Sequence, residues 1–423
     1  MATEVTDTPR PPTSFGGRLK LVGPGLIIAA TGVGAGDLIS TIVAGSEFGT
    51  ALLWAVLIGV VLKFVLTEGI GRWYMASGTT ILEAWYSLGR IVRGYFVVYL
   101  FLLTFVYGAA VTSACGLAMS AMVGVLPVWA WAVIHGIAGM LIVGIGRYGL
   151  FERVMELFVG ITFVTIVGLA ILLTPNLGSI ASGFVPSLPD NSLLLALGLV
   201  GGIGATLTLA SYTYWVRERG WREPAWIPMM RFDSGVGYLV TGIFAVSTLI
   251  IGAEFLFGSG ASIEDEEGLV ALSGPLGERF GALASWLFLI GFWAAAFDSV
   301  IGAWNGFAYL FADYVRIARG VGDREEKGEL SEKSPAFRGF LLWITFPPMI
   351  LLFFDRPVFI VIVYAALGAF FLPFLAGTLL YLLNSGRVAP EHRNRPLTNV
   401  VLAAAVLLFA ALAVQEIAGV VSG

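Results

Sequence analysis

The stretch from Thr31 to Ser46 reads TGVGAGDLISTIVAGS and lies inside an apolar segment that begins near Gly23 and is long enough to cross a bilayer. Its centre carries glycine at positions 32, 34 and 36, and the carboxylate of Asp37 follows at once. Glycine weakens a helix by roughly 1 kcal/mol relative to alanine, and an ionised side chain at membrane depth costs about 2.5 kcal/mol or more. The stretch therefore predicts a helix that is broken inside the membrane, with free carbonyls and an acid that faces a cavity.

The composition is that of a polytopic membrane protein. The 423 residues are 58% hydrophobic and 12% charged, with a mean hydropathy of +0.89, whereas a soluble domain is about 45–50% apolar and about 25% charged. The net charge of −4 offers no argument for a nucleic-acid partner. A single cysteine, Cys115, excludes an internal disulfide, and two histidines exclude a multi-histidine metal site.

Eleven apolar segments have the length of a membrane span. They lie near residues 22–45, 51–76, 95–125, 128–146, 152–174, 192–216, 234–257, 281–315, 338–354, 357–384 and 398–420. Basic residues gather in the tail before residue 21 and in every second connection, while the connections at 46–50, 174–190 and 258–277 contain no Lys or Arg. The positive-inside rule then predicts a cytosolic N-terminus, a C-terminus outside, and insertion in the cytoplasmic (inner) membrane. We expect a cytosolic tail over residues 1–20 and one transmembrane domain over residues 21–421.

The sixth apolar segment repeats the glycine pattern of the first. Its sequence GLVGGIGATLTLAS (198–211) places four glycines before Thr206, Thr208 and Ser211. Two glycine-interrupted spans that lie five spans apart are typical of an inverted-repeat transporter with a binding site near the midplane. The repeats would cover about residues 21–175 and 190–385, with an extra helix at about 398–420. The alternative is that these glycines only allow close helix packing.

Several short motifs give this chain a family resemblance. GPG (23–25), AGSEFGTALLW (44–54), RYGLFERVME (147–156), GAT (204–206) and LPF (372–374) occur in the order and at the spacing found in the Nramp family of proton-coupled divalent-metal transporters. The chain resembles this family over about residues 20–420. The resemblance implies an all-α membrane fold of the LeuT type, in which helices 1 and 6 are broken, and transport by alternating access.

The functional signature of that family is altered here. Its first-span motif DPGN corresponds to Gly34-Ala35-Gly36-Asp37, so the first acid is absent and an acid replaces the asparagine. Its sixth-span MPH corresponds to Thr208, Leu209 and Ala210, and its tenth-span glutamine corresponds to Phe371. The third-span acids thought to handle protons have no counterpart between residues 94 and 127. Because a thioether favours softer ions, its loss argues for magnesium or manganese over iron, and the missing acids argue for weak or no proton coupling.

Asp37 is the first candidate for an ion ligand. The expected oxygen set also includes backbone or side-chain oxygens of Thr31, Gly34, Ala205, Thr208 and Ser211. Oxygen donors suit a hard divalent ion, with retained water to complete its shell. The alternative structural role for Asp37 is to cap the N-terminus of the second half-helix.

Three further charged residues are candidates for the pathway or for coupling. Glu68 and Arg72 are spaced to pair on one face of the second span, a structural role that we favour. Lys63 lies within an apolar run, where it would either snorkel to the interface or replace a translocated cation electrostatically. Asp298 lies at membrane depth in the eighth span and could pair with Lys63, or line the pathway with Ser299 and Asn305.

These residues predict a secondary transporter of a divalent cation that needs no cofactor and acts in the lipid bilayer. Enzyme activity is not expected, since no histidine lies near a nucleophile candidate and no P-loop is present. One alternative is a transporter of a small organic cation, with Asp37 pairing the ammonium and Tyr212 or Trp304 supplying a π face. Another is a member that binds its ligand without transport. No oligomeric state is predicted.

Overall fold

The computed structural model describes residues 11–173, 176–258, 266–320, 330–354 and 357–422. Every regular element in these ranges is helical, as predicted. The first half contains α1 (Phe15–Leu19), α2 (Pro24–Gly32), α3 (Ala35–Phe48), α4 (Leu53–Ser77), α5 (Ile81–Ser87), α6 (Arg90–Val123), α7 (Val128–Gly144), α8 (Tyr148–Thr162), the π-helical η1 (Phe163–Val167), α9 (Gly168–Leu172) and α10 (Leu177–Gly183).

The described elements of the second half are also helical. It contains α11 (Leu193–Gly202), the 3₁₀ turn η2 (Leu207–Ser211), α12 (Tyr212–Glu218), η3 (Pro224–Trp226), α13 (Ile227–Phe255), α14 (Glu266–Ala271), α15 (Ser273–Phe280), α16 (Ala282–Ala318), α18 (Pro335–Thr345), η4 (Pro347–Phe354), α19 (Pro357–Leu382), η5 (Pro390–His392) and α20 (Pro396–Ser422).

The eleven predicted segments are all helical. Within the described residues, seven spans are long and apolar enough to cross a membrane, and α2 with α3 adds a span bent by 61°. Three shorter apolar helices, at Val128–Gly144, Phe370–Leu382 and Pro396–Ala411, account for the remaining segments. The predicted division into a tail and two repeats stays a prediction.

Local sequence signals set the ends of several helices. Pro24 stands at the first position of α2, where a missing N–H costs nothing. Thr80 and Glu83 form a reciprocal capping box at the start of α5. Gly78 and Gly124 end α4 and α6 in the left-handed conformation, which glycine adopts without a steric penalty.

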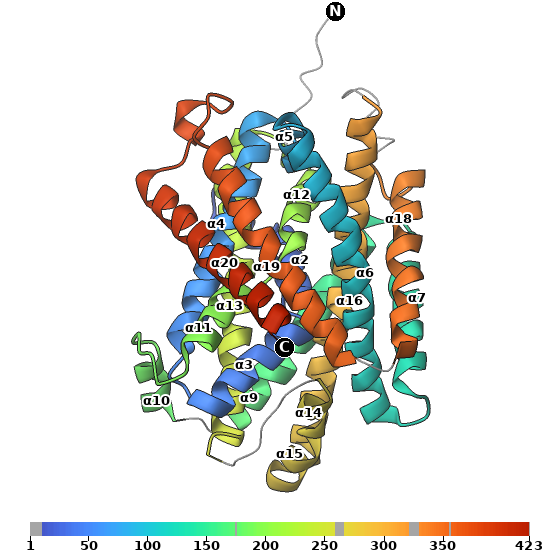
Figure 1. The fold of residues 1–423 in the computed structure, drawn as a ribbon, viewed down its shortest axis with the longest axis vertical. Coiled ribbons are helices and arrows are strands. Elements are labelled where there is room, and N and C mark those ends of the chain that lie inside the picture. Colours follow the sequence, from blue (N-terminus) through green and yellow to red (C-terminus); the bar gives the residue numbers. More distant parts are fainter. Residues whose placement is uncertain (1–10, 174–175, 259–265, 321–329, 355–356, 423) are drawn as a thin grey trace, which may run out of the picture.

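The broken first span packs in the middle of the bundle (Figure 1). α13 contacts α2, α3 and α4, while α16 contacts α2, α6 and α8. Glycine permits the closest of these approaches, because a Cβ at Gly237 would lie 2.0 Å from the carbonyl oxygen of Gly25 and one at Gly252 would lie 2.2 Å from that of Ile42. Close helix packing therefore explains Gly237 and Gly252, which lie in α13 and outside the two broken spans.

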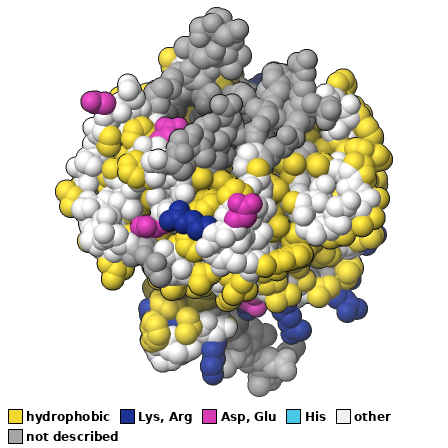
Figure 2. Space-filling view, turned by 90° about the horizontal axis from the view of Figure 1, so that it is seen from below, with side chains coloured by type: hydrophobic (Ala, Val, Ile, Leu, Met, Phe, Trp, Pro, Cys, Tyr) yellow, Lys and Arg dark blue, Asp and Glu magenta, His cyan; other side chains and the backbone are white. Residues whose placement is uncertain are grey.

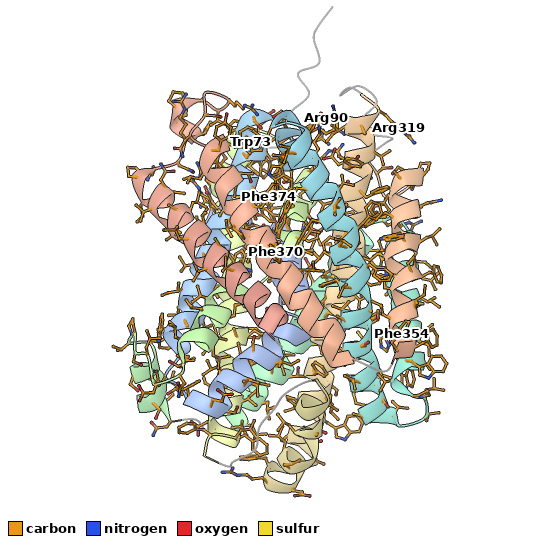
Figure 3. All side chains as sticks on the ribbon, in the orientation of Figure 1. Trp73, Arg90, Arg319, Phe354, Phe370 and Phe374 are labelled. Atoms are coloured by element: carbon orange, nitrogen blue, oxygen red, sulfur yellow. The ribbon has the colours of Figure 1, made fainter. Side chains whose placement is uncertain are left out.

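Large hydrophobic side chains are exposed on the described part of the surface, Leu57, Val61 and Leu102 among them. Figure 2 views the end that carries α10, α14 and α15 and shows hydrophobic side chains over much of it, with few charged ones among them. At the opposite end, where the N-terminal chain emerges, Figure 3 places Arg90 and Arg319. The structure thus brings these two basic residues to the end that the sequence predicts to be cytosolic.

Candidate functional site

The two glycine-interrupted spans are both broken, and their breaks touch. α2 ends at Gly32 and α3 begins at Ala35, while α11 ends at Gly202 and helical structure resumes at Leu207. A Cβ on Gly32 would lie 2.6 Å from the backbone nitrogen of Ala205, so only glycine allows this approach. Gly204 has φ +79°, in the left-handed region. The prediction of paired helix breaks is confirmed.

Asp37 joins the two breaks. It is the third residue of α3, is 8% exposed, and its Oδ2 accepts a hydrogen bond of 3.0 Å from the backbone N–H of Gly204. Its Oδ1 has no hydrogen-bond partner within the described part of the chain. The N-cap of α3 is Gly34, without a side-chain cap bond, so the capping interpretation of Asp37 was wrong. A carboxylate in the first turn is still stabilised by the helix dipole.

Lys63 brings a positive charge to the same place. It is fully buried in α4, and its Nζ donates to the carbonyl oxygens of Gly204 at 3.0 Å and Ala205 at 2.7 Å. The ammonium also attracts the carboxylate of Asp37 electrostatically. Lys63 therefore does not snorkel to an interface but occupies carbonyls at the sixth-span break, including the Ala205 carbonyl expected for a metal ion.

The remaining residues of the predicted oxygen set lie along the two breaks. Thr31 donates its hydroxyl to the carbonyl of Ile27 at 2.7 Å, and its own carbonyl accepts from Ser299 Oγ of α16 at 3.4 Å. Gly34 also faces Ser299, since a Cβ there would lie 3.2 Å from the Ser299 hydroxyl. The carbonyl end of α2 thus points toward α16.

Thr208 and Ser211 belong to the turn after the second break. Both are buried in η2. Ser211 packs against α16, where a Cβ on Gly306 would lie 2.7 Å from its hydroxyl oxygen, and this hydroxyl has no hydrogen-bond partner. In the described ranges, no group of three or more His, Cys, Asp and Glu residues comes together. An ion here would rely on Asp37 and neutral oxygens.

Glu68 and Arg72 form the predicted pair, with Arg72 Nε 3.0 Å from Glu68 Oε1. Arg231 adds a second contact of 2.8 Å to the same carboxylate oxygen. Arg72 also donates to the carbonyl of His392 at 2.7 Å and to the side chain of Asn394 at 2.8 Å. These contacts tie α4 to α13 and to the connection before α20, as expected of a structural pair.

Asp298 is buried in α16 without the partner that the sequence suggested. Its carboxylate contacts the Ser299 hydroxyl at 3.5 Å, whereas the Lys63 ammonium is bound to the sixth-span carbonyls. Asn305 bonds to Trp215 and Glu332 rather than lying with Asp298. The pairing of Asp298 with Lys63 was therefore wrong.

The sequence reading missed two polar networks at the end predicted to be cytosolic. Asp233 of α13 accepts from the N–H of Gly23 and from the hydroxyl of Tyr212, both at 2.9 Å. Arg219 pairs with Glu152 at 2.8 Å. An acid directly before the apolar segment that starts near residue 234 was the available signal for the first network.

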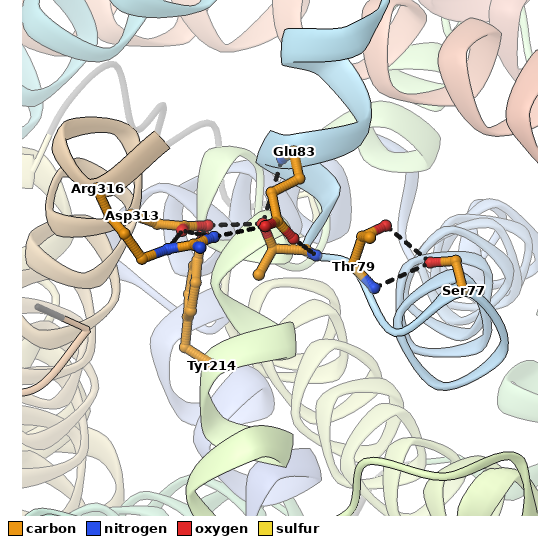
Figure 4. A network of polar contacts seen from close by, with 7 residues as sticks. Ser77, Thr79, Glu83, Tyr214, Asp313 and Arg316 are labelled. Carbon is orange, nitrogen blue, oxygen red and sulfur yellow. Dashed lines mark hydrogen bonds and ion pairs between the residues drawn. The ribbon is translucent and has the colours of Figure 1, made fainter. Parts of the chain in front are cut away.

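The second network joins α5, α12 and α16 (Figure 4). Asp313 accepts from the hydroxyls of Thr80 at 2.6 Å and Tyr214 at 2.8 Å, and it pairs with Arg316 at 2.8 Å. Arg316 also pairs with Glu83 at 2.7 Å. This network fastens α5, α12 and α16 to one another at one end of the bundle.

Glu332 lies outside the spans, in the turn before α18, and adds a further contact between elements at this end of the bundle. It accepts a hydrogen bond of 2.9 Å from Asn305. Burial raises its pKa from 4.5 to about 7, the Asn305 hydrogen bond opposes this rise, and the nearby negative charge of Glu218 adds to it.

Both aromatic residues of the alternative amine site are buried within the bundle. Tyr212 is fully buried and donates to Asp233, and Trp304 is fully buried in α16. His135 bonds to the carbonyl of Trp131 and accepts from Trp293, as expected of a satisfied bundle residue.

The chain is similar to known proteins over most of its length. A family model described as "Natural resistance-associated macrophage protein-like" (Nramp) matches residues 25–419. The chain is 25% identical over 302 residues to the divalent metal cation transporter MntH of Bacillus subtilis, covering 67% of this chain and 68% of that protein. It is 24% identical over 304 residues to MntH of Staphylococcus aureus, covering 67% and 66%.

Solved structures match over nearly the whole chain. A crystal structure of a mutant of the Eremococcus coleocola manganese transporter superposes with a TM-score of 0.80 at 17% identity, covering 97% of this chain and 89% of that one. The same transporter in complex with an aromatic bis-isothiourea compound gives 0.79 at 18% identity, covering 98% and 91%. At this identity the match establishes the fold, which is the predicted one.

Proposed function

This chain belongs to the Nramp family, and we propose on that premise that it is a secondary transporter that carries a divalent metal cation across the cytoplasmic membrane by alternating access. The MntH relatives, which are named as divalent metal cation transporters, support the substrate class. The contact between the two broken spans, with the buried Asp37 at their junction, supports the position of the ion site.

The observation that carries the proposal is Asp37 at the contact of the two breaks. Its Oδ2 is held by the Gly204 amide, which leaves Oδ1 to bind an ion. The carbonyl of Thr31 at the end of α2, the carbonyl of Gly34 at the N-cap of α3 and the hydroxyl of Thr208 would supply neutral oxygens. An all-oxygen set with one carboxylate suits magnesium or manganese with retained water.

Lys63 supplies the second part of the mechanism. A fixed ammonium already lies on the carbonyls of Gly204 and Ala205. We infer that Lys63 is a resident cation that holds the sixth-span break together when no ion is bound. The arriving ion would displace the ammonium from Ala205, and the membrane potential would drive uptake without an obligatory proton.

The two networks described above support an outward-facing state. Asp233 and Asp313 fasten the helices at the end that carries the N-terminus, which the basic connections predict to be cytosolic. Gly36 and Gly202, at the two breaks, are exposed. Opening toward the cytoplasm would therefore require these acids to exchange partners.

Flux of manganese, magnesium or cadmium into proteoliposomes tests the proposal. We expect uptake that follows an imposed inside-negative potential, with little acidification of the lumen, and its loss in Asp37→Ala. Asp190→Ala, which removes an exposed carboxylate, is the matched control and should transport normally. Absence of flux for all three metals at any pH gradient would contradict transport, and metal binding without flux would indicate a receptor-like member.

A further inference from the structure

The connection between α19 and α20 gathers positive charge at the end of the bundle that the sequence predicts to be cytosolic (Figure 1). It carries three exposed arginines, Arg387, Arg393 and Arg395, against one carboxylate, that of Glu391. We call these three arginines the basic rim. Within the ranges that the structure describes, none of the three forms an ion pair, so their charge is available to a ligand.

Two hydrogen bonds position the basic rim. Arg387 Nη1 donates to the hydroxyl of Ser87 at the end of α5, and Arg393 Nε donates to the carbonyl of Val388 at 3.4 Å. A guanidinium group has five N–H donors, so one such bond leaves others for a second acceptor. Its planar fork matches the oxygens of a phosphate group, which it binds through two parallel hydrogen bonds. The rim is therefore suited to a phosphate.

Exposed apolar side chains lie next to the basic rim. Leu397 and Val400, at the start of α20, are 75% and 65% exposed, and Tyr381, near the end of α19, is 58% exposed. Both helices contain apolar stretches of the kind that enter a bilayer. A ligand at this place meets positive charge at the helix ends and apolar surface along the helices. A phospholipid uses both features, whereas a soluble phosphate would use only the charge.

The connection is also fastened to α4 from inside the bundle. Arg72 donates to the carbonyl of His392 at 2.7 Å and to the side chain of Asn394 at 2.8 Å, and the N–H of Asn394 donates to the carbonyl of Leu383 at 3.1 Å. α20 contacts both α19 and α4. Because two rim arginines flank Asn394 in the chain, a ligand that holds them also holds α20 against α4.

We propose that the basic rim binds the headgroup phosphate of an anionic phospholipid in the cytosolic leaflet, with the acyl chains along Tyr381, Leu397 and Val400. An anionic lipid is favoured over a zwitterionic one, because the second carries a cationic group that the arginines repel. The bound lipid stabilises the packing of α19 and α20 on α4 and α5. This site does not depend on which ion the helix junction carries.

Thermal unfolding of the purified full chain in mixed micelles tests the site, with phosphatidylglycerol compared with phosphatidylcholine in the same nonionic detergent. We expect phosphatidylglycerol to raise the unfolding midpoint more than phosphatidylcholine does, and the difference to shrink as salt is added. Arg387→Gln should weaken the apparent affinity for phosphatidylglycerol about fivefold. The triple variant, with Gln at all three rim positions, should lose most of the difference between the two lipids.

Arg222→Gln is the matched control, because Arg222 is an exposed arginine beside Glu223 in another connection at the same end. It should keep the full response to phosphatidylglycerol. Inorganic phosphate at the same concentration separates a lipid from a soluble anion, and we expect it to leave the midpoint unchanged.

Equal midpoints in the two lipids would overturn the proposal. So would a full phosphatidylglycerol response in the triple variant, or a shift of equal size with inorganic phosphate, which would show a soluble anion as the ligand. The midpoints of all variants in detergent alone show that they fold, and the single variant gives the comparison where the triple variant does not.

Discussion

Lys63 is the residue whose role depends most on its surroundings. In the sequence it is a cation in an apolar run; in the fold it is the donor that satisfies two carbonyls left open by the sixth-span break. A buried ammonium is tolerated only with such partners and an opposing charge, which Asp37 supplies. The same contacts place Lys63 in competition with any ion at Ala205.

Replacement of Lys63 by methionine tests this competition. Lys63→Met keeps the stem volume but leaves Asp37 without its counter-charge and frees the Ala205 carbonyl, so we expect a lower unfolding midpoint without metal. Manganese should restore the midpoint, with an affinity raised about tenfold. The measurement is a thermal shift over a manganese titration, and Lys20→Met, at an exposed position, is the control. Weaker manganese binding in Lys63→Met would show that the ammonium assists the ion.

At the level of elements, the broken first span is positioned by its contact with α16. Gly302 allows this contact, because a Cβ there would lie 2.0 Å from Thr31 Oγ1 and 2.8 Å from Thr31 Cβ. Thr31 is also the residue whose carbonyl meets Ser299. One interface therefore fixes both the end of α2 and the carbonyls around the break.

Gly302→Ala should strain this interface. We expect a loss of about 1–3 kcal/mol in stability, typical of an overpacked core, together with reduced metal uptake because the break moves. Gly160→Ala in α8, where a Cβ meets nothing within 4 Å, is the control and should be neutral or stabilising. Thr31→Ala in the Gly302→Ala background removes Oγ1, the nearest clashing atom, and Cγ2 but keeps Cβ, so it should recover part of the stability. Failure of the double variant to recover would place the strain elsewhere.

For the whole molecule, the contacts that hold the helices together at the N-terminal end of the bundle depend on acids from different elements. Asp233, Asp313 and Glu332 each receive hydrogen bonds from another element. Glu332 lies outside the spans, where pH can act on it directly.

The raised pKa of Glu332 predicts a pH-dependent stability with a definite sign. The folded chain holds its proton up to about pH 7, whereas the unfolded chain releases it near 4.5, so the folded state binds more protons in this interval. Stability should therefore fall as pH rises from 4.5 to about 7 and level off above. Glu332→Gln should remove this part of the slope in thermal unfolding and raise the midpoint at alkaline pH. Glu391→Gln, at an exposed carboxylate, is the control, and an unchanged slope in Glu332→Gln would exclude Glu332 as the source.

The sequence by itself determined the helical segments, the two breaks and the central acid. Apolar length is sufficient to predict a span, and glycines beside a charge at membrane depth are sufficient to predict a break, since both are local costs. Glu68 and Arg72 could be paired because their spacing on one helix fixes their distance.

Only the tertiary structure decided which partner each buried charge has. Lys63 reaches Gly204 and Ala205 across 141 and 142 residues of chain, and Asp37 reaches Gly204 across 167. The proposed pairing of Lys63 with Asp298 failed because complementary charges do not reveal the rotation of two separate helices. Asp233 was missed for the same reason. Partners of this kind depend on how helices pack, which no local pattern contains.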